Sequence, residues 1–588
     1  GQGEIGGSAS LVKSGPCTLV IQTTNTYSGA TILNGGAVEV AELAPAGSPS
    51  AIGAAGANPT NLVFNGGALR YTGPSVSVDR NATVGEGGGA LDVTASTLTL
   101  NGVLEGPGTL TKAGAGTLTL QSANQHAGGF VVAEGTLRTM IPASAGPGTI
   151  TLSGGTLLLG LPSDNDLPND IEVAEESTLA MGSSNNRVNG DLSGSATLHV
   201  DISAAASSVL TFNGNLTNFN GTFDLGSSVG VFRLNSGGGN STFGFPNAAI
   251  DLGTATAALQ ARNAGTMHVG ALFGGPDTQL RGQGSGSGTL IWQIGSSTNS
   301  PDSLFEGTIV DATASRIVGI TKVGPGTLTL NNPNNTYTGP TRIEGGVLAL
   351  AAGPLGDGTL GLSSEIFVAE GAALDLSGRI DPTLILDGSQ TLRGGGTIRG
   401  SVISAGIVAP GTLTTLGTLT ITNDVQLLVQ TTMKLNRGSA ARNDKVVAQT
   451  ITLGGILEII NIGGNLQVGD TFDLFDGNIT DGGVFVQGPE GVTFDTSMLA
   501  VNGTITVTGA PAPLQFGVVS RDGDNLVVTG SGGVPFGTYH VLSTTNLANP
   551  VALWTQVATD FFDENGGFTL TIAIDPDLPQ QFFRIERQ

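Results

Sequence analysis

The sequence predicts an all-β protein, a long β-solenoid followed by a small antiparallel β-sandwich. Three observations support this fold class. Glycine contributes 94 of 588 residues without a Gly-X-Y period. Short strands that alternate polar and apolar residues recur about every 20 residues, which is typical of solenoids. No stretch has a convincing helical period, so helices are expected to be rare.

Composition limits the classes of function. The net charge is −24 and only 12% of residues are charged, which disfavours binding to nucleic acid or to an anionic membrane. No apolar run reaches the roughly 18 residues of a membrane-spanning helix, so no membrane insertion is expected. Cys17 is the single cysteine, which excludes an intrachain disulfide. We predict that Cys17 lies near the surface and makes an intermolecular contact.

Three stretches of about 30 residues share one pattern and begin at Lys13, Lys112 and Lys322. Their repeated glycines are Gly15, Gly29 and Gly36, then Gly114, Gly128 and Gly135, then Gly324, Gly339 and Gly346. We predict that these glycines occupy turns, where a positive φ suits glycine. The third copy has one extra residue in its loop, which a stack of strands joined by loops tolerates. The lysines are predicted to keep solvated turns soluble; a row of anion-binding lysines is the alternative.

The spacing of leucines predicts the register of the stack. Leu328 and Leu348 are 20 residues apart, and Leu118 and Leu137 are 19 apart. Each coil therefore places its leucines inward on those of the coil below, in parallel register. Weaker copies of the strand–turn–strand pattern lie at residues 62–71, 150–159, 366–376 and 451–459. The solenoid is predicted to span residues 1–508.

The pattern K-x-G-x-G-T-L-x-L, N-x-Y-x-G and G-G-x-L closely resembles the autotransporter-associated β-strand repeat, also called the passenger-associated transport repeat. Residues 212–226 and 406–421 are similar to segments that accompany it. The resemblance implies a right-handed parallel β-helix on a secreted or surface-exposed bacterial protein. It does not specify a function, because adhesins, proteases and polymers all use such stalks. Cys17 departs from the pattern, since the other copies have Gly116 and Gly326 there.

A Pro-rich joint at residues 509–515 precedes a different kind of sequence. Residues 516–588 contain several aromatic-rich strands, which predict a separate β-sandwich module hinged at Pro511 and Pro513. Residues 521–525 and 563–567 are predicted to form hairpin turns. The aromatic residues and the closing QQFFRI resemble C-terminal modules on secreted proteins of the Verrucomicrobia and their relatives. That resemblance implies a role in secretion, anchoring or assembly.

No catalytic residues are predicted. The four histidines are His126, His199, His268 and His540. They are scattered and none precedes a glycine, so we interpret them as structural; His126 occupies the repeat position of Tyr27 and is expected in a turn. No HExxH or CxxC pattern is present, so no zinc site is expected.

Two other motifs resemble ligand-binding patterns. Residues 164–170 carry three aspartates, but Pro168 occupies a ligand position and no closing Glu follows, so a solvated loop is expected rather than a calcium site. Residues 1–6 and 356–361 satisfy G-x-G-x-x-G, but neither opens a helix, so no dinucleotide cofactor is expected. The predicted cofactor list is empty.

The sequence thus favours a secreted, non-enzymatic structural β-solenoid. Its expected location is extracellular or at the cell surface, as a subunit of a bacterial fibre or as an adhesin stalk. The alternative is a carbohydrate-active β-helix, whose mark would be carboxylates with an Arg or Lys on neighbouring coils of one face. A third possibility is a carbohydrate-binding tail that uses Tyr539 and Trp554, with surface polysaccharide as partner.

The start of the chain suggests one further partner, another copy of the protein. Residues 5–13 align with residues 104–112, so the first residues already lie inside a coil. An uncapped coil exposes backbone groups and a leucine stack that pair readily with another chain. Either upstream coils are missing, or copies assemble head-to-tail in a contact that propagates.

Overall fold

The computed structural model describes residues 3–235, 244–296, 301–512, 514–549, 551–575 and 577–587. About half of the chain is β-strand and 2% is helix, and the parallel β-solenoid has about 19 turns. The chain divides into two compact units. Unit 1 contains residues 1–367 and 372–381, and unit 2 contains residues 368–371 and 382–588.

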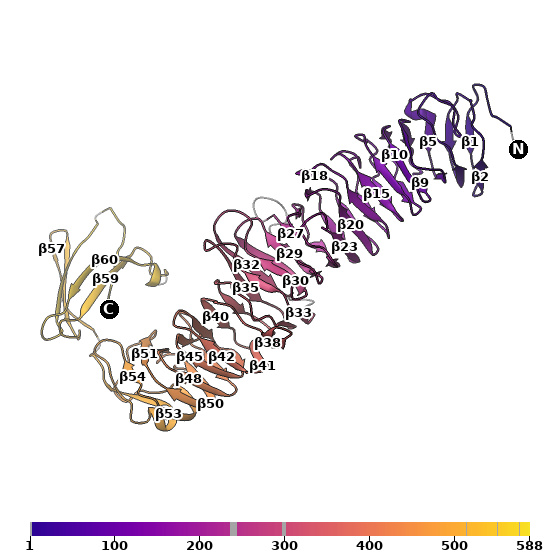
Figure 1. Cartoon of the computed structure of the whole chain (residues 1–588). Helices are drawn as coiled ribbons and strands as arrows, with labels where there is room; N and C mark the ends of the chain where they lie inside the picture. The colour runs from indigo at the N-terminus through magenta and orange to yellow at the C-terminus, as the bar shows by residue number, and fades with distance from the viewer. Residues whose placement is uncertain are drawn as a thin grey trace. The chain divides into compact units, whose positions relative to one another are not determined.

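Unit 1 consists of coils whose strands pair in parallel with those of the next coil (Figure 1). The first row of strands contains β1 (Leu11–Lys13), β3 (Thr31–Leu33), β5 (Leu62–Phe64), β8 (Ala82–Val84) and β11 (Leu104–Glu105). The second row contains β2 (Thr18–Ile21), β4 (Ala37–Val40), β6 (Ala68–Tyr71), β9 (Gly89–Val93), β12 (Leu110–Ala113), β14 (Phe130–Val132), β16 (Ile150–Leu152), β19 (Ile171–Val173), β22 (Leu192–Gly194) and β25 (Asn218–Phe219).

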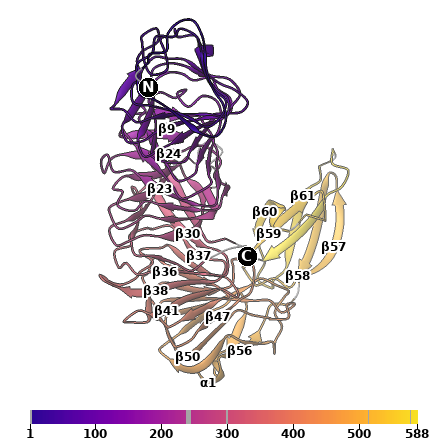
Figure 2. The same ribbon diagram turned by 90° about the vertical axis from the view of Figure 1, so that its right-hand side faces the viewer.

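The third row in unit 1 contains β7 (Val76–Val78), β10 (Thr97–Leu100), β13 (Thr117–Leu120), β15 (Thr136–Thr139), β17 (Thr156–Leu159), β20 (Ser177–Met181), β23 (Thr197–Asp201), β26 (Thr222–Asp224), β28 (Gly244–Asp251), β30 (Gly265–Phe273), β32 (Gly288–Ile294), β35 (Arg316–Lys322) and β37 (Thr341–Ile343). The fourth row contains β18 (Asn165–Leu167), β21 (Asn185–Val188), β24 (Val209–Phe212), β27 (Val231–Leu234), β29 (Ala258–Ala261), β31 (Gln279–Arg281) and β34 (Thr308–Val310). A fifth row contains β33 (Ser303–Phe305), β36 (Thr327–Leu330), β38 (Val347–Gly353) and β41 (Ala373–Gly378), and β39 (Gly356–Asp357) pairs with β38; Figure 2 shows β36, β38 and β41 in consecutive layers.

The predicted register is confirmed. Leu118 pairs with Leu137 across β13 and β15, and Leu328 pairs with Leu348 across β36 and β38. All four side chains are fully buried. Burying one leucine side chain stabilises a fold by about 1.5–3 kcal/mol, so a continuous leucine column strongly favours this register.

The first part of unit 2 also consists of parallel coils, and an antiparallel sheet follows them. Its parallel strands are β42 (Thr383–Leu386), β43 (Thr391–Gly394), β44 (Thr397–Arg399), β45 (Ser401–Ser404), β46 (Ile407–Pro410), β47 (Thr418–Ile421), β48 (Asp424–Leu427), β49 (Gln430–Leu435), β50 (Lys445–Leu453), β51 (Ile456–Asn461), β53 (Phe475–Asp481) and β54 (Phe485–Gln487). After them, β55 (Thr493–Asp495) and β56 (Thr504–Gly509) form an antiparallel sheet with β52 (Thr471–Asp473). The four-residue helix α1 (Leu499–Asn502) ends at Gly503, whose φ of 78° lets the chain reverse into β56. Parallel pairing therefore ends before residue 508.

The C-terminal module is a two-layer antiparallel sandwich. One sheet contains β57 (Gln515–Asp522), β58 (Asn525–Ser531) and β61 (Phe568–Ala573), and the other contains β60 (Thr555–Phe561), β59 (Thr538–Thr544) and β62 (Phe582–Arg587). Their shared core includes Val528, Tyr539, Val541 and Phe568. Because Tyr539 is 1% exposed, it is a core residue and is not available to stack on a sugar.

Two turn predictions had different outcomes. The turn at 521–525 is a hairpin, because Asp522 pairs with Asn525 across β57 and β58. The hairpin predicted at 563–567 is wrong, because this turn joins β60 of one sheet to β61 of the other. There Asp563 accepts backbone hydrogen bonds from Asn565 and Gly567. Of the predicted hinge residues, Pro513 lies outside the described residues.

Candidate functional site: the repeat turn

Each repeat copy holds a lysine ammonium among the carbonyl oxygens of two stacked turns. Lys112 Nζ donates to the carbonyl oxygens of Ala113 (2.9 Å), Gly114 (2.6 Å) and Glu134 (2.9 Å). Glu134 belongs to the turn that follows β14, one coil further on. The Lys112 side chain is fully buried, with 0% exposure of the residue. The ammonium therefore fastens one turn to the next.

The other two copies have the same arrangement. The acceptors are Ser14, Gly15 and Gly35 for Lys13, and Val323, Gly324 and Gly345 for Lys322. The prediction that the lysines keep solvated turns soluble is wrong, because Lys13 and Lys322 are only 8% and 2% exposed. The alternative of an anion-binding row also fails, since the lysines lie on three different rows, in β1, β12 and β35.

Burial of these ammonium groups has an electrostatic consequence. It lowers the pKa of Lys112 and of Lys322 to about 8, because the charged form loses its hydration. Three carbonyl oxygens replace the lost water at each ammonium, which is the condition for burying a polar group at low cost.

The alternation of residues along the strand could have predicted that the lysines are buried. In β12, Leu110 and Lys112 are two residues apart and therefore on the same face of the strand. In the stack, Lys112 pairs with Leu91 on one side and Val132 on the other, both fully apolar. The aliphatic stem of the lysine thus occupies a position in a core column, and only the ammonium reaches the turn.

Six of the nine repeat glycines have the left-handed backbone conformation. They are Gly15, Gly36, Gly114, Gly135, Gly324 and Gly346, with φ between 62° and 75°. A Cβ on Gly135 would come within 3.0 Å of the carbonyl oxygens of Gly114 and Gly116. The absence of a side chain there lets the second turn approach the carbonyls that hold the lysine.

The other three glycines serve a different purpose. Gly29, Gly128 and Gly339 do not have a positive φ, and they lie against the backbone of the preceding coil. At each one a Cβ would come within 3.0 Å of that backbone, at Ala9, Gly108 and Val318 respectively. Close stacking of the loops, rather than turn geometry, excludes larger residues here.

An asparagine in each copy links three successive coils. Asn124 Oδ1 accepts a hydrogen bond from Leu104 N (2.8 Å), and its Nδ2 donates to Ser144 O (2.6 Å). Asn25 and Asn335 make the equivalent pair of bonds to the coils on either side. Each asparagine is at most 6% exposed, so these bonds satisfy backbone groups that would otherwise be unpaired.

The aromatic position of the repeat is part of the core. The hydroxyls of Tyr27 and Tyr337 each lie 2.7 Å from a threonine hydroxyl. His126 occupies the same position, where its Nε2 lies 3.2 Å from Gly129 O and its ring packs edge-on against Phe130. Burial lowers the pKa of His126. His126 is thus a core residue, 0% exposed, and not the turn residue that was expected.

Cys17 has an exposed side chain and no disulfide. It stands at the position of Gly116, beside the turn that holds Lys13. Its predicted intermolecular contact stays a prediction.

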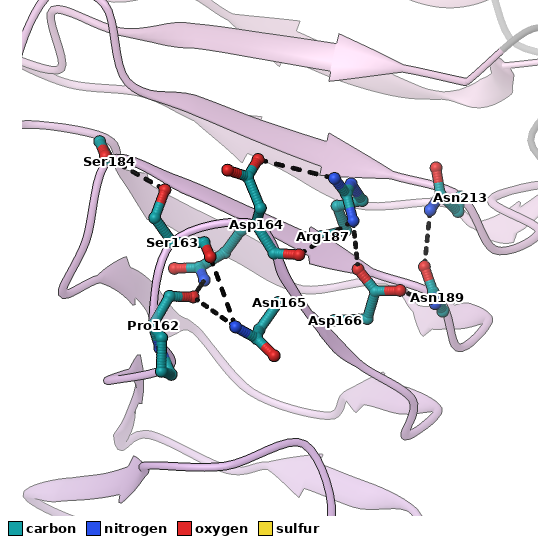
Figure 3. Close-up of polar contacts among 10 residues, drawn as sticks. Pro162, Ser163, Asp164, Asn165, Asp166, Ser184, Arg187, Asn189 and Asn213 are labelled. Carbon is teal, nitrogen blue, oxygen red and sulfur yellow. Dashed lines mark hydrogen bonds and ion pairs between the residues drawn. The ribbon is translucent and has the colours of Figure 1, made fainter.

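Charged side chains form ladders on the outer faces of neighbouring coils. Figure 3 shows Arg187 of β21 between Asp164 and Asp166 of the preceding coil, at 3.6 Å and 2.9 Å. Asn189 then connects Asp166 to Asn213. The expected solvated loop at 164–170 is wrong in part, because residues 165–167 form β18 and its aspartate is ion-paired.

A second ladder joins Arg70 to Glu39 (3.6 Å) and Asp92 (2.6 Å) on the coils at either side. These ladders place carboxylates and an arginine on neighbouring coils of one face, which is the arrangement expected of a carbohydrate-active β-helix. In both ladders, however, each carboxylate is ion-paired with the arginine of a neighbouring coil, so it takes part in a coil-to-coil contact. A glycosidase needs a carboxyl group free to act on the sugar.

The remaining histidines lie apart from one another. His199 bridges Glu176 (2.9 Å) and Asp224 (2.8 Å), and hydrogen bonding to these carboxylates raises its pKa. His268 bonds to Gln293, and His540 to Thr559 in the C-terminal module. Within the described residues no group of three or more His, Cys, Asp or Glu side chains is arranged to hold a metal ion. No helix in the described part of the chain is long and apolar enough to cross a membrane.

Comparison with known proteins gives these turns a family context. The passenger-associated-transport-repeat model matches residues 11–40, 110–138 and 320–350, the three segments that contain the buried lysines. The chain carries passenger-associated transport repeats. It is also similar to the adhesin BmaC autotransporter of Brucella suis biovar 1 (strain 1330), with 30% identity over 393 residues. That match covers 63% of this chain but only 10% of the relative, so the chain spans about a tenth of the relative's length.

Proposed function

We propose that the chain is a secreted, non-enzymatic β-solenoid that forms a stalk or adhesive segment of a bacterial surface protein. The observation that carries this proposal is the use of the repeat's polar residues. Lysine, asparagine and the charged ladders all bond one coil to the next. Similarity to an adhesin autotransporter supports a surface location and an adhesive role.

Adhesion of coated beads tests the proposal. Beads carrying the purified full chain should be retained on cell layers or on surface polysaccharides more strongly than beads carrying albumin at equal density. The same polysaccharides should be incubated with the soluble chain and assayed for new reducing ends. Products would contradict a non-enzymatic role, whereas binding without products would identify surface polysaccharide as a partner. Retention equal to that of albumin beads would contradict the adhesive role.

Head-to-tail self-association stays a prediction and has its own test. Light scattering and electron microscopy of the purified chain over a wide concentration range should show fibres or concentration-dependent oligomers. A monomer at every concentration would contradict a fibre subunit and would leave the stalk as the proposed role.

A further inference from the structure

Lys434 and Asp444 form a buried ion pair in unit 2. The two residues flank the loop between β49 and β50, and an antiparallel bridge between Leu435 and Asn443 closes the neck of that loop. Lys434 Nζ lies 2.6 Å from Asp444 Oδ2, with side-chain exposures of 4% and 0%. Burial raises the pKa of Asp444, because the carboxylate has lost its hydration.

Backbone groups hold both side chains in place. Asp444 Oδ1 accepts a hydrogen bond from Gly417 N (2.8 Å), and Oδ2 accepts one from Lys434 N (2.8 Å). Lys434 Nζ donates to Pro410 O (2.5 Å). The amine and the carboxyl group are therefore in contact, oriented, and shielded from water. Two fixed N–H donors directed at a carboxyl group also stabilise negative charge that develops on its oxygens.

We propose that Lys434 and Asp444 condense to an intramolecular isopeptide bond. A proton first passes from Nζ to Oδ2 within the pair, which gives a neutral amine and a neutral carboxylic acid. The Nζ lone pair then adds to Cγ, and the Gly417 N–H stabilises the charge on Oδ1. The C–Oδ2 bond breaks as Oδ2 takes a second proton from Nζ. One Nζ–Cγ amide bond forms and one water molecule leaves, so the reaction requires no oxidant or other reactant.

The surroundings favour the amide over the ion pair. Two charges buried in a protein carry a large desolvation cost, and the amide is neutral. The amide N–H retains Pro410 O as acceptor, and the amide carbonyl oxygen retains Gly417 N–H as donor, so both polar groups of the new bond have a partner. Only the backbone N–H of Lys434 loses its bond to Oδ2 when the water leaves. Holding the two groups in contact also removes the entropic barrier to their encounter.

The decisive measurement is the intact mass of the purified, unfolded full chain. We expect a mass lower than that of the sequence by one water molecule, together with a protease-resistant branched peptide joining Lys434 to Asp444. The variants Lys434→Met and Asp444→Ala should regain the full mass. Because either single change can unfold this region, the double variant Lys434→Met/Asp444→Leu, which replaces the pair by apolar side chains, should be measured beside them.

The neighbouring pair Lys445–Asp473 provides a matched control. Its Nζ–Oδ2 distance is 2.5 Å, but its side chains are 27% and 52% exposed. Lys445→Met should therefore leave the mass deficit unchanged. A wild-type chain of full mass would overturn the proposal. So would a deficit that persists in Lys434→Met, or one that peptide mapping places at an Asp-Gly succinimide.

Discussion

Replacing Lys112 by methionine tests the role of the buried ammonium directly. Methionine keeps most of the aliphatic stem that packs between Leu91 and Val132. It removes the donor shared by the carbonyl oxygens of Ala113, Gly114 and Glu134. The change therefore separates the contribution of the ammonium from that of the core column.

The expected cost follows from the three lost hydrogen bonds. A buried acceptor left without a partner costs about 1–3 kcal/mol. These carbonyls lie at turns that are only partly buried, so we use the lower figure for each and obtain about 3 kcal/mol. Removing the desolvation penalty of the charge returns part of this. We expect a net local destabilisation of about 2–3 kcal/mol, equal to roughly 30- to 150-fold in an opening equilibrium.

Hydrogen exchange is the suitable assay, because a long repetitive solenoid does not unfold in a single two-state step. Amides in β12–β15 should exchange faster in Lys112→Met by that factor. Lys445→Met is the matched control, since its partly exposed ion pair should contribute about 1 kcal/mol or less. Exchange within about twofold of wild type in Lys112→Met would refute the idea that the bonds from the ammonium to the three carbonyl oxygens stabilise the turns.

Three other predictions concern single positions. Asn124→Ala should accelerate hydrogen exchange in three successive coils, because the loss of two buried hydrogen bonds destabilises them by about 2–3 kcal/mol. Asn101→Ala, at an exposed position, should not have this effect. Equal effects of the two variants would contradict the bridging role of Asn124. Gly339→Ala should accelerate hydrogen exchange in its own coil more than Gly56→Ala does, because a Cβ at Gly339 meets the backbone of Val318, whereas one at Gly56 meets nothing within 4 Å and Gly56 has no positive φ; the reverse order would contradict the stacking argument. The pKa of His199 is raised in the folded state, so its ion pairs stabilise fully below about pH 6.5 and lose this effect as pH rises through the folded pKa. The free energy of local opening around β23, measured by hydrogen exchange, should differ between His199→Gln and wild type by a few tenths of a kcal/mol at about pH 5.5 and by less at about pH 8.5. A difference that grows with pH would contradict this sign.

The sequence was sufficient to predict the stacking of coils. A 19- or 20-residue spacing between leucines on alternating strands admits one parallel register, and Leu118 with Leu137 and Leu328 with Leu348 follow it. Strand–turn–strand copies without the lysine also fold as expected, for example β5–β6 and β16–β17. These features depend on local period and on apolar burial, which the sequence displays directly.

Features that depend on three-dimensional neighbours were not predictable in the same way. The turn at 563–567 has the composition of a hairpin, yet it crosses between two sheets because β60 and β61 pair with different strands. Lys434 and Asp444 are ten residues apart in the sequence, and only the closed loop brings Nζ to 2.6 Å from the carboxylate. Composition and spacing do not reveal which polar groups share a buried space.

The three repeat lysines are buried although charged side chains usually lie in solvent. The local sequence around each lysine explains the exception. Elsewhere in the Lys112 column the residue is apolar, as at Val132, so a lysine is not needed to fill the core. Each of the three lysines is followed, two residues later, by a glycine with φ between 72° and 75°, whose carbonyl oxygen accepts from Nζ. After Val132 that position is Glu134, and the left-handed glycine is Gly135 instead. Lysine and the glycine two residues on are therefore one structural unit, in which the turn supplies the acceptors that make burial of the charge possible.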